Sequence, residues 1–72
     1  MIKQIRQELG LSQGELGNKL GKTQGAISHY ETGRQLIDSS FASDLIELCE
    51  AHGVYADYNL IYGYVPNKAV NG

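Results

Sequence analysis

The polar residues best suited to chemistry gather in one short stretch, from Thr23 to His29, which also contains Gln24, Gly25 and Ser28. Their side chains carry hydrogen-bond donors and acceptors on short stems, and the glutamine amide presents one of each side by side. Such an amide matches N6 and N7 of an adenine, so the stretch suits a groove of base edges better than an apolar protein interface. The chemistry that this stretch predicts is recognition through hydrogen bonds.

The sequence has no recognisable catalytic or metal-binding arrangement. Its single cysteine, Cys49, and its two histidines, His29 and His52, lack the paired spacing of a zinc site, and no nucleophile stands in an evident pattern with a base. Cys49 lies on an apolar stripe, which favours a small buried side chain over a reactive thiol, and His52 is better suited to a helix end. We therefore expect no enzyme, no metal or other cofactor, and no small-molecule ligand.

The elements that must position the polar stretch are short helices separated by glycines. Apolar residues at helical spacing predict helices over 2–9, 13–20 and 24–32, then a longer fourth helix and a short fifth one. The predicted capping residues at the helix starts are Ser12 with Glu15, then Thr23, then Asp38, Ser39 or Ser40, and finally Asp57. The glycines that end the predicted helices are Gly10, Gly21, Gly33, Gly53 and Gly63.

The second and third predicted helices are joined so closely that they must meet at a sharp angle. Only Gly21 and Lys22 precede the Thr23 cap, and a connection this short gives the geometry of a helix-turn-helix. We expect one all-α domain over residues 1–65, followed by a flexible tail over 66–72. The predicted core consists of Ile5, Leu9, Leu16, Leu20, Ile27, Leu45, Leu48 and Ile61.

The segment from Gln13 to Gly33 resembles the helix-turn-helix of the lambda-repressor-like family, which includes phage repressors and Cro proteins. The residues that carry the resemblance are Gln13, the small residue Gly17 where the helices cross, Gly21 in the turn, the apolar anchor Ile27, and the closing Glu31 to Gly33. With the flanking residues 5–12 and a weaker fit of the fourth helix, the resemblance spans about three quarters of the chain. It implies a compact five-helix DNA-binding domain and a role as a transcriptional regulator.

The resemblance also implies roles for individual residues. In this family the front of the third helix enters the major groove and the start of the second rests on the sugar-phosphate backbone. The residues carried over to base reading are Gln24, Gly25, Ser28 and His29. Those carried over to phosphate binding are Gln13, Lys22, Thr23 and Arg34. Arg6 and Glu31 occupy positions that pair the first helix with the end of the third, which is a structural role.

The charges are divided unevenly along the chain. Residues 1–36 hold five cations and three anions, a net charge of +2, whereas residues 37–72 hold one cation and five anions, a net charge of −4. This division favours a first half that faces DNA and a second half that faces away from it. The chain departs from the family pattern after the third helix, where Gln35 to Asp38 lacks the extra basic residues. Leu36 or Ile37 could instead pack beneath the fourth helix.

The C-terminal region is rich in apolar and aromatic residues that one short helix cannot bury, namely Tyr55, Tyr58, Leu60, Ile61, Tyr62, Tyr64 and Val65. This composition predicts a homodimer formed by that region, although the same tyrosines could instead seal the core of a monomer. Two-fold pairing would place two recognition helices about 34 Å apart and match a palindromic site in double-stranded DNA.

The remaining expectations concern location and the competing function. No apolar run reaches the roughly 18 residues that a membrane span needs, and a hydrophobic signal segment is not evident, so a cytoplasmic location is expected. The competing function is a protein-interaction module, of the antitoxin or anti-repressor kind, that keeps the fold but binds a protein partner. The acidic net charge of −2 favours that alternative.

Overall fold

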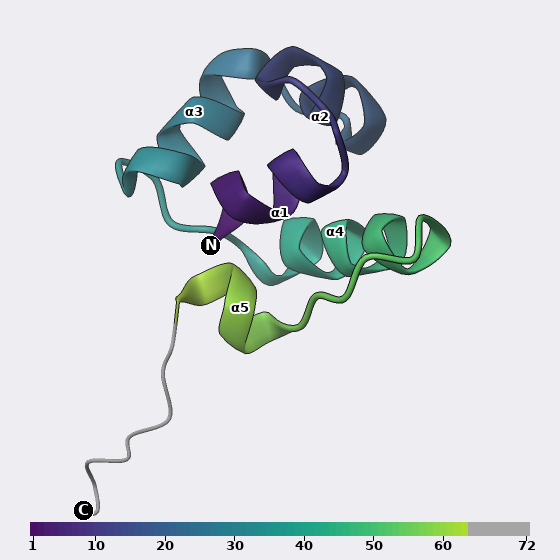
Figure 1. The fold of residues 1–72 in the computed structure, drawn as a ribbon. Helices are drawn as coiled ribbons and strands as arrows, with labels where there is room; N and C mark the ends of the chain where they lie inside the picture. Colours follow the sequence, from purple (N-terminus) through teal and green to yellow (C-terminus); the bar gives the residue numbers. More distant parts are fainter. Residues whose placement is uncertain (64–72) are drawn as a thin grey trace, which may run out of the picture.

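The computed structural model describes residues 1–63, and these residues form five α-helices and no strand. In chain order the helices are α1 (Ile2–Glu8), α2 (Gln13–Leu20), α3 (Gln24–Thr32), α4 (Ser39–Ala51) and α5 (Tyr58–Tyr62) (Figure 1). The predicted all-α, five-helix architecture is confirmed over this range. The predicted tail over 66–72 lies outside the described residues, as do Tyr64 and Val65.

Side chains just before the first turn start four of the helices. The Ser12 hydroxyl accepts from the Glu15 backbone N–H at 3.1 Å, and the Glu15 carboxylate accepts from the Ser12 N–H at 2.8 Å, which completes the capping box. Thr23 and Asp57 cap α3 and α5 without such a box, by accepting from one backbone N–H each, and Asp38 is the one of its three candidates that caps α4. Each cap satisfies a backbone donor that the helix leaves open, which stabilises it by about 1 kcal/mol.

The glycines that were predicted to end the helices all adopt positive φ angles, at Gly10, Gly21, Gly33, Gly53 and Gly63. The requirement is clearest at Gly21, where φ is 71° and the chain turns from α2 into α3 within three residues. A side chain at this φ would crowd the backbone, so glycine makes the turn possible without strain.

The core lies where the helices meet and consists of Ile2, Ile5, Leu16, Ile27, Tyr30, Phe41, Ala42, Leu45, Cys49 and Ile61. The rings of Tyr30 and Phe41 pack with their centroids 4.6 Å apart, which joins the end of α3 to the start of α4. Each buried side chain of this size stabilises the fold by about 1.5 to 3 kcal/mol, before the entropic cost of ordering the chain is counted.

The predicted core is only partly correct. Leu9, Leu20 and Leu48 are half-buried and pack against the core from its edge, rather than lying within it. Tyr30 and Phe41 lie in the core instead, where their aromatic rings fill more space than leucine side chains would. Of the two residues expected to pack after the third helix, Leu36 or Ile37, it is Ile37 that packs against the core, while the side chain of Leu36 is 91% exposed.

The arrangement of the helices leaves one face of α3 uncovered. In Figure 1, α1 occupies the middle of the fold, with α2 and α3 on one side and α4 and α5 on the other. α3 packs against α2 and α1, and α5 packs against α1 and α4. No helix in the described range is long and apolar enough to cross a membrane.

Gly17 allows the turn that follows α2 to pack closely against that helix. A Cβ built on Gly17 would collide with the carbonyl oxygen of Lys22, and it would lie 3.3 Å from the carbonyl carbon of Thr23. Because the obstacle is backbone, no side-chain rotation can relieve the collision. The small residue therefore makes room for the turn before α3 rather than for α3 itself.

Candidate nucleic-acid interface

The uncovered face of α3 carries most of the side chains predicted to read bases. Gln24, Gly25 and His29 are exposed and Ser28 is half-buried, while Ile27 and Tyr30 point the other way into the core. Within residues 1–63 the side chains of Gln24, Ser28 and His29 make no hydrogen bond, whereas those of the Thr23 cap, Glu31 and Thr32 do. Their donors and acceptors are therefore free to bond an outside molecule.

Gly25 is a glycine that the fold itself does not require. Its φ is not in the left-handed region, and an added Cβ would meet only the Thr23 hydroxyl oxygen, at 3.9 Å. Glycine inside a helix costs about 1 kcal/mol relative to alanine. At Gly25, therefore, the outward face of α3 exposes backbone that no side chain covers.

Three side chains form a hydrogen-bonded cluster beneath this face. The Glu31 carboxylate at the end of α3 accepts from Arg6 Nε at 2.6 Å and Nη2 at 3.2 Å, and from Gln13 Nε2 at 3.0 Å. Arg6 also donates from Nη1 to the Leu11 carbonyl oxygen at 3.0 Å. The Arg6 and Glu31 side chains are only 13% and 6% exposed. The cluster ties α1, the start of α2 and the end of α3 together.

The electrostatics of the cluster favour both charges. Burial desolvates the Glu31 carboxylate and would raise its pKa, but hydrogen bonds from Arg6 and Gln13 outweigh that effect, so the pKa lies below its ordinary value. The hydrogen bond to Glu31 raises the pKa of the Arg6 guanidinium. The pair is therefore fully ionised at neutral pH, and it fixes the orientation of α3 relative to α1.

Gln13 has a partner that its position in the sequence did not suggest. One N–H of its side-chain amide is used by Glu31, which leaves the second N–H as a donor. Because Ser12 caps the Glu15 N–H, the backbone N–H groups of Gln13 and Gly14 at the start of α2 also stay open. These donors lie at a helix start, where the helix dipole favours an anion.

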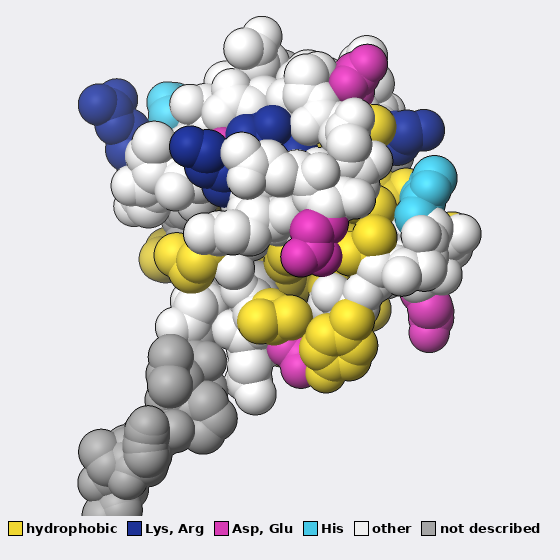
Figure 2. Space-filling model, in the orientation of Figure 1, with side chains coloured by type: hydrophobic (Ala, Val, Ile, Leu, Met, Phe, Trp, Pro, Cys, Tyr) yellow, Lys and Arg dark blue, Asp and Glu magenta, His cyan; other side chains and the backbone are white. Residues whose placement is uncertain are grey.

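The cations predicted to contact phosphates lie on either side of α3. Lys22 is half-buried in the turn before it, and Arg34 is exposed just after Gly33, with its backbone N–H donated to the His29 carbonyl oxygen at 2.9 Å. In the view of Figure 2, Lys and Arg side chains lie across the upper part of the molecule, while the hydrophobic ones gather lower down. Of the first-half surplus of positive charge, residues 13–34, which include α2 and α3, hold three cations and two anions, and α1 supplies the other unit.

The sequence matches one known protein family over most of its length. The model described as helix-turn-helix matches residues 2–59, which run from α1 into α5. The chain belongs to this family. The match extends over both helices of the motif, α2 and α3, and agrees with the lambda-repressor-like resemblance. Among curated proteins and among solved structures, none matched the chain.

Because it belongs to the helix-turn-helix family, this protein is a DNA-binding regulator. In such proteins the second helix of the motif enters the major groove. α3 occupies that place, and its outward face is the polar one described above. Leu16 of α2 and Ile27 of α3 are both fully buried in the same core, and the two helices of the motif pack against each other.

Two residues considered for chemistry lie elsewhere in the helix-turn-helix domain. Cys49 is a free cysteine, fully buried in the core, and burial together with the charge of Glu8 raises the pKa of its thiol. The thiol is therefore protonated and shielded, which suits packing rather than reaction. His52 is exposed and forms the C-cap of α4, with its backbone N–H donated to the Cys49 carbonyl oxygen at 3.0 Å.

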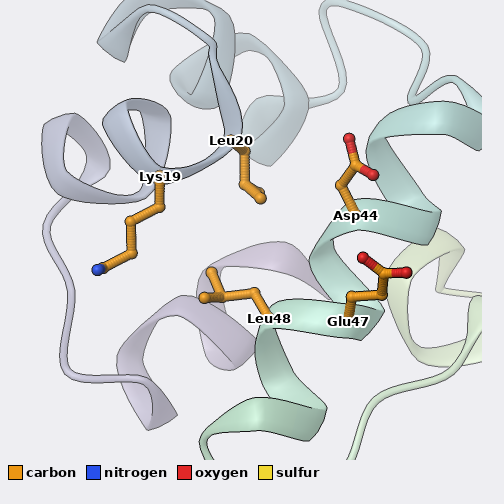
Figure 3. A pocket seen from close by; sticks show the side chains of 5 residues that line it. All are labelled: Lys19, Leu20, Asp44, Glu47 and Leu48. Atoms are coloured by element: carbon orange, nitrogen blue, oxygen red, sulfur yellow. The ribbon is translucent and has the colours of Figure 1, made fainter.

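A hollow of about 410 Å³ separates the C-terminal part of α2 from α4 (Figure 3). Leu20 and Leu48 project into it, the carboxylates of Asp44 and Glu47 stand along the α4 side, and Lys19 extends from α2. None of the residues predicted to contact DNA lines this hollow. It is a second surface feature, separate from the face of α3.

Proposed function

We propose that this protein is a sequence-specific regulator of the repressor or Cro type, which binds a palindromic operator in double-stranded DNA as a homodimer. The observation that carries the proposal is the outward face of α3. Its polar side chains have no hydrogen-bond partner in the described range, and at Gly25 no side chain covers the backbone. A face of this kind suits the major groove, whose base edges present hydrogen-bonding groups.

Gln24 is the residue that we assign to base discrimination. It is the first residue of α3, exposed beside the Thr23 cap, so it stands at the end of the helix that leads into the groove. Its amide matches N6 and N7 of an adenine as a bidentate pair. Ser28 and His29 lie one turn further along the helix and supply additional donors and acceptors, while Gly25 allows a close approach.

Phosphate contacts fix the register of the protein on DNA without reading its sequence. We assign them to Gln13, Lys22, Thr23 and Arg34, which lie at the starts of α2 and α3 and just after α3. The remaining amide N–H of Gln13 and the open backbone donors at the start of α2 can share one phosphate. The cluster with Glu31 holds Gln13 in place for that contact.

The homodimer is assigned to the surface around α5. Tyr58, Leu60 and Tyr62 are 48%, 42% and 45% exposed, and Tyr55 is exposed beside them. Exposed apolar and aromatic side chains this close together favour a second copy of the chain, paired about a two-fold axis. A regulator of this kind works in the compartment that holds the DNA, which supports the cytoplasmic location expected from the sequence.

Selection from random duplexes tests the base-reading assignment. Wild type should select one palindromic motif, and Gln24→Ala should lose preference at one base pair of each half-site, costing about 1 to 3 kcal/mol on the selected site. Gln7→Ala, which removes an exposed glutamine from α1, is the matched control and should select the wild-type motif. Identical motifs for Gln24→Ala and wild type would contradict the assignment.

The hollow between α2 and α4 favours a second function, which is binding to a protein partner. Two leucines line the hollow and two carboxylates stand along one side, so a basic segment with apolar residues would fit it. Both functions can occur in one molecule, because the hollow and α3 are separate. Titration of DNA at two salt concentrations distinguishes them: a salt-independent absence of DNA binding would leave the protein partner as the main function.

A further inference from the structure

α5 is tied to the segment that follows α3 by one long-range hydrogen bond. The hydroxyl of Tyr62 donates to the Ile37 carbonyl oxygen at 2.9 Å, across 25 residues of sequence. Tyr62 is 45% exposed, so its ring contributes little to the core and the hydroxyl is its specific contact. We call residues 33–38, between α3 and the Asp38 cap of α4, the α3–α4 loop.

The α3–α4 loop is anchored at both ends and carries Arg34 near its start. The N–H groups of Arg34 and Gln35 both bond the His29 carbonyl oxygen, at 2.9 and 3.3 Å, and Asp38 caps α4 through the Phe41 N–H at 2.7 Å. Between these anchors Leu36 is 91% exposed. The Tyr62 hydroxyl and the half-buried side chain of Ile37 are what hold this middle part against the domain.

We propose that Tyr62 is a positioning residue for DNA binding, which fixes the α3–α4 loop so that Arg34 meets the phosphate backbone. The inference rests on the phosphate contact assigned to Arg34 above. An anchored loop presents the guanidinium already ordered, whereas a loose loop must lose conformational freedom when it binds. Tyr62 acts through the backbone at Ile37 and itself touches no DNA.

The physical reason for the effect is that a backbone carbonyl released from Tyr62 bonds water instead. The carbonyl is near the surface, so its release costs the fold little. The loop gains freedom, however, and Arg34 lies only three residues from the freed carbonyl. Removing the Tyr62 hydroxyl should therefore lower mainly the affinity for DNA, and this effect should depend on the Arg34 side chain.

A double-mutant cycle between Tyr62→Phe and Arg34→Ala tests the inference, with a mixed-sequence duplex at several salt concentrations. Tyr62→Phe removes only the hydroxyl and should weaken binding about threefold. Arg34→Ala should weaken binding and reduce the slope of log affinity against log salt by about one unit. In the Arg34→Ala background, Tyr62→Phe should cause no further loss, because the group that the loop positions is gone.

Asn59→Ala is the matched control, since it removes from the same helix an exposed polar side chain with no hydrogen bond in the described range, and it should leave the affinity unchanged. Urea unfolding should show the same small effect of Tyr62→Phe with and without Arg34. Equal loss of affinity in both backgrounds would overturn the inference, because Tyr62 would then act on the whole fold. Normal affinity of Tyr62→Phe beside a clear effect of Arg34→Ala would overturn the inference alone, whereas no effect of Arg34→Ala would overturn the phosphate contact as well.

Discussion

Arg6 Nε lies 2.6 Å from Glu31 Oε2, and this contact joins the last turn of α1 to the last turn of α3 across 25 residues. The second contact, from Nη2 to Oε1 at 3.2 Å, makes the pair bidentate, so it restricts both distance and angle. The pair has a structural role, because it restricts the orientation of α3 relative to α1. A change in the geometry of the pair would alter that orientation.

Removing one member of this pair should cost stability. We expect Glu31→Ala to lower the free energy of unfolding by about 2 to 3 kcal/mol, because Arg6 is then left nearly buried without its partner. Urea unfolding measures the loss. Glu8→Ala, which removes an exposed carboxylate from α1, is the control and should change little. Similar losses in the two variants would show that the ion pair stabilises nothing.

The same carboxylate predicts a dependence of stability on pH. The pKa of Glu31 is lowered in the folded protein, so its contribution is fully present above the unfolded value, about 4.3, and is lost as pH falls through the folded value. Unfolding at a series of pH values between neutral and strongly acidic should therefore show wild type losing more stability than Glu31→Ala. Parallel curves for the two proteins would mean that Glu31 titrates normally in the fold.

Alanine at two positions of α2 should have opposite effects. Gly17→Ala should destabilise the protein by about 1 to 3 kcal/mol, because the new methyl group collides with the Lys22 carbonyl. Gly14→Ala, in the same helix, meets nothing within 4 Å and should raise stability by up to about 1 kcal/mol. Thermal unfolding followed by circular dichroism compares them. A stable Gly17→Ala would show that the turn is not as tight as described.

Gly25→Ala should separate folding from DNA binding. A methyl group there has room within the protein, so the stability should rise by up to about 1 kcal/mol. It would also stand between α3 and the groove, so we expect the affinity for the selected operator to fall about tenfold. Fluorescence anisotropy and urea unfolding give the two quantities. Ser43→Ala on α4 is the control, and Gly25→Ala binding as tightly as that control would remove the close approach at Gly25.

A charge at the α5 surface should separate the two copies of the proposed dimer. Leu60→Lys places an ammonium group on the exposed apolar surface of α5, so sedimentation should find a monomer, with weaker binding to a palindromic operator. Asn59→Lys carries the same charge on the same helix and should remain dimeric. Wild type sedimenting as a monomer, both free and on DNA, would rule out the dimer itself.

Local chemistry explains how much of the fold could be predicted. The helix starts at Ser12, Thr23 and Asp57 could be predicted because a cap depends only on the next three residues. The helix ends could be predicted because glycine readily adopts the positive φ that ends a helix. The core was harder to predict, since the burial of Leu20 or Tyr30 depends on how the helices cross. The bond from Gln13 to Glu31 could not be predicted either, because it requires the start of α2 to lie beside the end of α3.

The backbone at Gly33 has φ of 80°, and nothing lies within 4 Å of the place where the Cβ of an L residue would be, so any strain there comes from the backbone conformation. That φ belongs to the mirror image of the ordinary helical region, so the handedness of an amino acid decides whether it fits. A D-alanine introduced by chemical synthesis would take up this conformation without strain and would restrict the unfolded chain, whereas an L-alanine would be strained. The end of the DNA-reading helix is therefore a place where chirality alone, with the same atoms, would turn a destabilising substitution into a stabilising one.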